Sequence, residues 1–87
     1  MIFDIHYSNQ SRKFLKKTER ILLKRLIEKI EKLKEEPIIA DSKKIEGAKG
    51  LFRVRVGDYR ILYEVDYENR EIGIVGIDKR EDAYLRK

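Results

Sequence analysis

Three arginines, Arg53, Arg55 and Arg60, are the residues of this sequence best suited to chemistry. They lie in the segment FRVRVGDYRILYEV, where polar and apolar residues alternate as in β-strands and Gly57-Asp58 is typical of a two-residue hairpin turn. A guanidinium group is charged at neutral pH, and its planar fork of donors matches the geometry of phosphate. The pattern favours one of two arrangements: a site that binds anions, or a solvated sheet face whose arginine stems cover apolar neighbours.

The hairpin turn fixes which residues share a face of the predicted sheet. With Gly57 and Asp58 as the loop, Arg55 pairs with Arg60, and residues directly opposite one another point to the same side. The apolar face would hold Phe52, Val54, Val56, Tyr59, Ile61 and Tyr63. The other face, called here the arginine face, would hold Arg53, Arg55, Arg60 and Leu62. Because it lies away from the apolar face, we expect its arginines to be open to solvent.

A third strand is expected over residues 71–77, after a reversal at Glu68-Asn69. Regular alternation would extend the apolar face through the pairs Val65–Ile72, Tyr63–Ile74 and Ile61–Gly76. It would extend the arginine face through the pairs Leu62–Val75 and Arg60–Ile77, with Lys79 following on that face.

The first part of the chain predicts the elements that cover the apolar face. Residues 2–7 alternate as in a short strand, and no Gly or Pro interrupts residues 9–36. Within that stretch the residues of one helical stripe are Leu22, Leu26, Ile30 and Leu33. Such a stripe is the natural partner of an apolar sheet face.

Helix boundaries follow from residues with special backbone preferences. Ser8 or Ser11 is suited to cap the first turn, and Thr18 to begin a second helix. Pro37 ends that helix, because the residue before a proline disfavours the helical conformation. Residues 37–50 then form a connection. The order predicts an α+β fold, β-α-α-β-β-β, with a small antiparallel meander sheet and two helices packed on one face.

Composition limits the partners and the compartment. The chain has 87 residues, which suits one domain over 1–87, and its net charge of +5 favours an acidic partner such as nucleic acid. It has no Cys, one His and no acidic run with the spacing of a calcium loop, so we expect no metal and no other cofactor. No apolar run approaches the roughly 20 residues of a membrane span, and no signal peptide is evident, so we expect a cytoplasmic protein.

The segment KKIEGAKGLFRVRVGDYRILYEVDYENREIGIVGIDKREDAYLRK resembles the C-terminal half of RelE-family toxins, in the RelE/ParE superfamily. The resemblance rests on the lysine-rich loop, on GDYRILYEV, and on a last strand followed by a basic pair and a tyrosine. The preceding strand and helices also follow the family order. It implies the microbial-RNase-like RelE fold and a metal-independent endoribonuclease. Such a toxin cleaves messenger RNA in the ribosomal A site, inhibits translation and is neutralised by a RelB-type antitoxin.

The same resemblance implies roles for single residues. Arg53 and Arg55 match two basic positions near the scissile phosphate, whereas Arg60 and Arg80 match arginines that stabilise the developing negative charge. Tyr84 matches a tyrosine that stacks on a base or helps proton transfer. The lysines expected to contact RNA are Lys43, Lys44, Lys49 and Lys79.

One part of the implied reaction has no obvious residue. Cleavage by the substrate's own 2′-OH needs a base, charge stabilisation at the phosphorane and an acid for the leaving 5′-oxygen. Arginines suit only the second task, because guanidinium does not titrate near neutrality. Members of the family often have lysine where this chain has Arg53 and Arg55. The proton carriers left open are Lys79, Tyr84, a loop lysine, Glu81 and Asp82, while His6, in the first strand, suits a structural or surface role.

Two other functions stay open. A ParE-type toxin poisons DNA gyrase and needs no nuclease site. A catalytically degenerate toxin would only bind RNA or its antitoxin, and the arginines in place of lysines keep this alternative open. The arginine set together with Tyr84 favours the nuclease.

Overall fold

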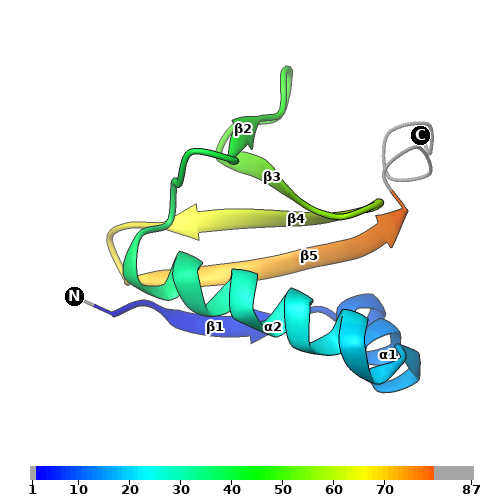
Figure 1. Cartoon of the computed structure of the whole chain (residues 1–87). Coiled ribbons are helices and arrows are strands. Elements are labelled where there is room, and N and C mark those ends of the chain that lie inside the picture. Colours follow the sequence, from blue (N-terminus) through cyan, green and yellow to red (C-terminus); the bar gives the residue numbers. More distant parts are fainter. Residues whose placement is uncertain (1, 80–87) are drawn as a thin grey trace.

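A sheet and two helices on one of its faces make up the fold (Figure 1). The computed structural model describes residues 2–79. In chain order the elements are β1 (Asp4–Tyr7), α1 (Asn9–Lys17), α2 (Arg20–Glu35), β2 (Lys43–Lys44), β3 (Leu51–Val56), β4 (Tyr59–Asp66) and β5 (Glu71–Lys79). The strand order is β1-β5-β4-β3-β2, with β1 parallel to β5 and the other neighbours antiparallel. The α+β fold class is confirmed, although the sequence pattern predicts neither β2 nor the parallel pairing of β1.

Side chains at the helix ends explain where the helices begin and end. Ser8 caps α1, because its Oγ accepts a hydrogen bond from a first-turn N–H at 3.1 Å. The chain breaks between the helices where expected, but Thr18 ends α1 and donates its hydroxyl to the Phe14 carbonyl at 2.6 Å. Glu19 is the residue that caps α2, through two N–H groups of its first turn. Pro37 follows the end of α2 as predicted.

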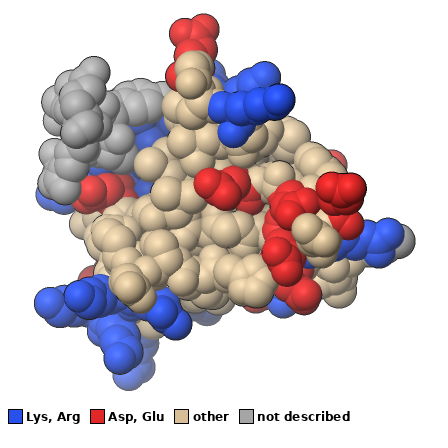
Figure 2. All heavy atoms as spheres, turned by 180° about the vertical axis from the view of Figure 1, so that it is seen from behind, with Lys and Arg blue, Asp and Glu red and all other residues tan. Residues whose placement is uncertain are grey.

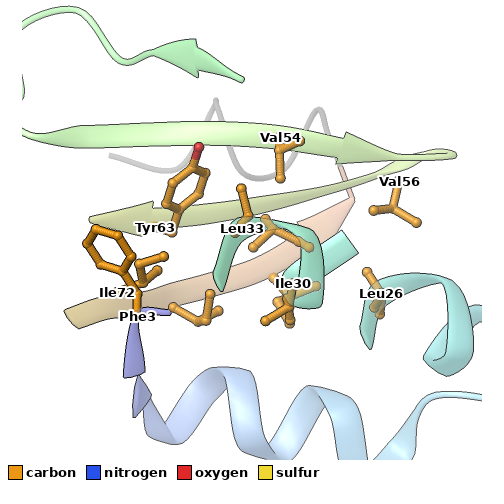
Figure 3. Packing of buried hydrophobic residues seen from close by; sticks show 11 residues of the cluster. Phe3, Leu26, Ile30, Leu33, Val54, Val56, Tyr63 and Ile72 are labelled. Carbon is orange, nitrogen blue, oxygen red and sulfur yellow. The ribbon is translucent and has the colours of Figure 1, made fainter. Parts of the chain in front are cut away.

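The core lies between α2 and the sheet, as Figure 3 shows. Leu26, Ile30 and Leu33 of the helical stripe are buried, and Leu22 is half-buried. The sheet residues buried with them are Val54, Val56, Ile61, Tyr63, Ile72, Ile74 and Ile77. Each side chain of this size contributes about 1.5–3 kcal/mol when it is buried. This packing decides which sheet face turns inward and leaves the arginine face on the outside.

The β3–β4 hairpin has the predicted register throughout. Gly57, the first loop residue, has φ +60°, as the first position of a type II′ turn requires. Val56 lies opposite Tyr59 and Arg55 opposite Arg60, and the pairing continues to the start of β3. The short turn therefore sets the faces of both strands.

The β4–β5 register agrees with the prediction only near its turn. The pairs Val65–Ile72 and Tyr63–Ile74 occur as expected. A β-bulge between Leu62 and Tyr63 of β4 then shifts the pairing by one residue. The pairs beyond the bulge are Leu62–Gly76, Ile61–Ile77, Arg60–Asp78 and Tyr59–Lys79.

The bulge corrects the predicted faces of β5. Val75 is the extra residue, so every later side chain of β5 changes face. Ile77, expected on the arginine face, is buried in the core. Asp78 takes its place opposite Arg60. Lys79, also expected on the arginine face, shares the helix-covered side with Tyr59 and is exposed.

Candidate functional site

The cations of the arginine face lie in neighbouring rows of residues across β2, β3 and β4. One row runs from Lys43 of β2 through Arg53 of β3 to Leu62 of β4. The next row joins Arg55 of β3 and Arg60 of β4. Because directly opposite residues share a face, the sheet brings all four cations to one side.

The three arginines differ sharply in exposure. Arg55 is exposed and Arg53 is half-buried, but Arg60 is only 2% exposed, so the expectation of a solvent-open arginine is wrong for Arg60. The exposed and the buried arginine also differ in their strand neighbours. β4 is an inner strand with neighbours on both sides, whereas β2 covers only Phe52 and Arg53 of β3 and leaves Arg55 at an open edge. The arginine face therefore combines a buried arginine with one that is open to solvent.

Asp78 gives this cluster a carboxylate that the sequence pattern does not predict. It is half-buried and lies directly opposite Arg60 in the register. Opposite charges at directly paired positions are favourable, and like charges such as Arg55 and Arg60 are not. A buried guanidinium also needs a compensating charge. Asp78 thus brings a negative charge into the same row as Arg55 and Arg60, and its Oδ1 accepts a hydrogen bond from the Lys79 N–H at 3.1 Å.

The lysines expected to contact RNA do not lie together. Lys43 is exposed on the arginine face beside Arg53. Lys44 pairs with Phe52 and so belongs to the opposite side, as does Lys79. Lys49 is exposed in the loop between β2 and β3. Of these four residues, Lys43 is the one that the structure joins to the arginines.

Several expected site residues lie outside the described part of the chain. These are Arg80, Glu81, Asp82 and Tyr84. His6 is described and is exposed at the far edge of the sheet, with its Nε2 3.5 Å from the Glu71 carboxylate. It lies on the edge strand β1, three strands away from β3, which agrees with a surface role.

The groups whose pKa is raised lie away from the arginine face. Burial raises the pKa of Tyr63, whose hydroxyl donates to the Pro37 carbonyl at 2.7 Å and bonds to the Ser42 hydroxyl at 2.7 Å. Burial and the nearby Glu31 raise the pKa of Tyr7. Both tyrosines belong to the helix-covered side, since each pairs with Ile74. Within residues 2–79 the arginine face therefore supplies fixed positive charge more clearly than a proton carrier.

Figure 2 shows the arginine side of the molecule and its uneven charge. Asp and Glu side chains gather on one flank, and Lys and Arg side chains stand at other margins. The register places Asp4, Glu71 and Asp66 in one row near the β4–β5 turn. A polyanion is therefore repelled from that end and attracted to the end near the β3–β4 turn.

Metal and membrane features are absent from the part of the chain that the structure describes. No three His, Asp or Glu side chains in residues 2–79 come together to hold a metal ion. Neither α1 nor α2 is long and apolar enough to cross a membrane. A shallow hollow of about 540 Å³ lies between α1, the start of α2 and Tyr59, and none of the three arginines lines it.

The sequence pattern missed the bulge and hence Asp78, although one signal was available. Gly73 and Gly76 both lie within β5. Glycine inside a strand often marks a bulge or a close backbone approach. A Cβ on Gly76 would stand 3.4 Å from the Gln10 side-chain oxygen, which is an ordinary contact, so the bulge is the feature that these glycines indicate.

Known proteins share both the sequence and this fold. Residues 5–84 match the family described as ParE toxin of type II toxin-antitoxin system, parDE. A protein of Methanocaldococcus jannaschii named RelE1 is 37% identical over 87 residues, which cover 97% of each chain.

Two solved structures show the same similarity in three dimensions. One is the archaeal RelE-RelB complex from Pyrococcus horikoshii, with a TM-score of 0.81 and 29% identity over 92% of this chain and 97% of that one. The other is the toxin-antitoxin complex RelBE2 from Mycobacterium tuberculosis, with a TM-score of 0.76 and 26% identity over 92% of this chain and 100% of that one.

Proposed function

The chain belongs to the RelE/ParE superfamily as a RelE-type toxin of type II toxin–antitoxin systems, and we propose that it is a ribosome-dependent endoribonuclease that cleaves messenger RNA. The observation that carries the proposal is the gathering of Arg53, Arg55 and Arg60 with Lys43 in adjacent rows of one sheet face. Three guanidinium groups on one sheet face suit a bound phosphate that gains negative charge during the reaction.

The proposed reaction needs no covalent intermediate with the protein. The 2′-OH of the substrate attacks the adjacent phosphorus and the bond to the 5′-oxygen breaks, which leaves a 2′,3′-cyclic phosphate and a 5′-hydroxyl. One proton leaves the 2′-OH and one reaches the 5′-oxygen. The arginines stabilise the dianionic phosphorane between these two proton transfers.

The positions of the arginines suggest a division of work. Arg60, buried in an inner strand with Asp78 opposite, has a fixed guanidinium suited to charge that develops in the transition state. Arg55, at the open edge, is free to grip the incoming RNA backbone. Arg80 and Tyr84 remain part of the proposed site by family resemblance, with Lys79, Lys44 and Lys49 as more distant contacts to RNA.

Two partners follow from the proposal. Binding in the ribosomal A site would place the message on the arginine face and position it for cleavage, which lowers the demand for a strong base. A RelB-type antitoxin would neutralise the toxin, since the similar archaeal and mycobacterial proteins were solved as toxin–antitoxin complexes. Since the proposed target is the ribosome, the toxin would act in the cytoplasm.

Gyrase poisoning is the second candidate function, because the matching family carries the ParE name. Such a toxin would need no cluster of arginines aimed at a phosphate. The arginine face therefore favours cleavage. The two functions can be distinguished in cells by whether translation stops or DNA is damaged.

Expression from a tightly repressed promoter tests the proposal. We expect translation to stop within minutes, and primer extension on cellular messages to show new ends at codons in the ribosomal A site. Co-expression of the cognate antitoxin should restore growth. Continued translation with DNA breaks and an induced damage response would instead establish the gyrase function. Binding to ribosomes without new ends would establish the degenerate toxin.

A further inference from the structure

The start of α1 lies against the far edge of β5, where β1 no longer reaches. β1 pairs with β5 only as far as Tyr7 opposite Ile74. Beyond that point, the edge of β5 is bound by side chains of Ser8, Gln10 and Ser11. Ser8 donates its hydroxyl to the Val75 carbonyl at 2.8 Å, and Ser11 donates its hydroxyl to the Ile74 carbonyl at 3.2 Å.

Gln10 binds β5 in the way that a neighbouring strand would. Its Nε2 donates to the Ile77 carbonyl at 2.8 Å, and its Oε1 accepts from the Ile77 N–H at 2.9 Å. A side-chain amide carries both a donor and an acceptor, so it can satisfy both backbone groups of one residue. Gln10 therefore replaces the missing strand at Ile77.

This contact favours the bulged register over the regular one. Backbone groups of successive strand residues point to alternate edges, so the groups of Gly76 and Asp78 face β4 when those of Ile77 face Gln10. In the regular register, Ile61 would lie opposite Gly76, and Arg60 would lie opposite Ile77. The backbone groups facing Gln10 would then no longer be those of Ile77. The bulge and the Gln10 contact thus belong to the same arrangement.

We propose that Gln10 is a positioning residue: its amide locks β5 in the bulged register, which sets Asp78 rather than Ile77 opposite Arg60. The register itself needs no assumption about function. The consequence for catalysis rests on the proposed nuclease function. With Ile77 opposite Arg60, the row of Arg55 and Arg60 would lose the carboxylate of Asp78, and we expect the Arg60 guanidinium to change its position.

Nuclear magnetic resonance of the full chain tests the register directly. In an antiparallel pair that exchanges no hydrogen bonds, the two Cα atoms approach most closely, so their Hα atoms give a strong cross-strand Overhauser effect. The bulged register predicts this signal between Ile61 and Ile77. The regular register predicts it between Ile61 and Gly76. In Gln10→Ala we expect the Ile61–Ile77 signal to weaken and the Ile61–Gly76 signal to appear.

Gln10→Glu is a second variant that tests the same contact if Gln10→Ala does not fold. Its carboxylate accepts from the Ile77 N–H but has no proton for the Ile77 carbonyl. Below about pH 4 the protonated carboxyl regains the donor. We therefore expect the Ile61–Ile77 signal of this variant to be weak at pH 7 and to strengthen on acidification. In the unsubstituted protein, the Ile61–Ile77 signal should not strengthen on acidification.

The catalytic consequence is measured on ribosome-bound message below the onset of unfolding. Gln10→Ala should lower kcat by on the order of tenfold to a hundredfold, as a misplaced group does, with KM changed less than about twofold. Asn9→Ala is the matched control, because the Asn9 amide oxygen accepts only from Arg12 on the surface of α1, at 2.8 Å. It should retain both the kcat and the Overhauser pattern.

The outcomes separate the two proposals. An unchanged Ile61–Ile77 signal in both Gln10 variants overturns the positioning role. A shifted register with unchanged kcat overturns its catalytic consequence. If the protein with Gln10 cleaves no message at all, the nuclease proposal fails, and the Overhauser pattern still decides whether Gln10 sets the register.

Discussion

Arg53, Arg55 and Arg60 share one sheet face, yet a substitution at each would measure something different. Arg55 is exposed, so its removal changes charge with little loss of packing. Arg60 is 2% exposed, so its removal also leaves a hole in the packing of the sheet face. The alternation of the sequence predicts the shared face, because the turn fixes the register. It does not predict the burial of Arg60, because alternation assigns a side chain to a face and does not say what covers that face.

Arg55→Ala and Arg60→Ala should therefore separate catalysis from stability. We expect Arg55→Ala to change the free energy of unfolding by less than about 0.5 kcal/mol and to lower cleavage by on the order of a hundredfold. Arg60→Ala should lower cleavage and also destabilise the fold by about 1–3 kcal/mol. Thermal unfolding and single-turnover cleavage measure the two effects, with Arg70→Ala in the β4–β5 turn as the control. Normal cleavage by Arg55→Ala would remove this residue from the site.

Tyr63 is a single residue that should make the stability of the fold depend on pH. Burial raises the pKa of Tyr63, so the folded state holds the proton more tightly than the unfolded state does. The stability from this group is fully present below about pH 10, the unfolded value, and is lost as the pH rises through the folded pKa.

Tyr63→Phe removes this dependence along with the hydrogen bonds to Pro37 and Ser42. At pH 7 we expect the variant to be about 1 kcal/mol less stable. The difference from the unmodified protein should shrink as the pH rises above 10 in denaturant titrations. A difference that stays constant to higher pH would show that the Tyr63 hydroxyl titrates alike in both states.

At the scale of elements, the sequence predicts what local rules decide. The two-residue turn at Gly57 defines the β3–β4 register, and the helical stripe defines the face of α2 that packs inward. The sequence does not predict the bulge at Val75, because the regular register also gives a good alternation of polar and apolar residues. The two registers differ after Val75, where only the bulged one buries Ile77. β2 has only two residues, too few for an alternation of polar and apolar residues to be recognised. The parallel pairing of β1 with β5 joins the two ends of the described chain, so no local rule predicts it.

Gly57 tests how strictly the turn holds the hairpin. Its φ of +60° is unfavourable for any residue with a Cβ, and a Cβ there would stand 3.3 Å from the Arg25 guanidinium. We expect Gly57→Ala to cost about 1–2 kcal/mol of unfolding free energy. Gly73→Ala is the control, since it has ordinary φ and nothing within 4 Å of the added Cβ. Equal stability of the two variants would show that the turn does not need glycine.

At the scale of the molecule, charge should govern the encounter with RNA. The chain carries a net charge of +5, and Figure 2 shows acidic groups gathered most densely on one flank of the arginine side. Binding of a polyanion releases counterions in proportion to the phosphates that are neutralised. Association should therefore weaken as salt rises, and the arginine face should contribute part of that dependence.

Arg55→Ala should change the salt dependence of binding to single-stranded RNA. We expect the slope of log Kd against log salt to fall by about 0.7, the value for one phosphate contact on a single strand. Fluorescence anisotropy with a labelled oligonucleotide measures it. Glu68→Gln in the acidic β4–β5 turn is the control and should leave the slope unchanged. An identical slope for Arg55→Ala would place the RNA backbone elsewhere.

The most direct test uses purified ribosomes programmed with a defined message. The purified toxin should cut the message at the codon in the A site when the ribosome is present and leave free message intact. Arg55→Ala should cut on the order of a hundredfold more slowly under the same conditions. Full-length message after prolonged incubation with folded, unmodified protein would contradict the assignment of the arginine face as a nuclease site.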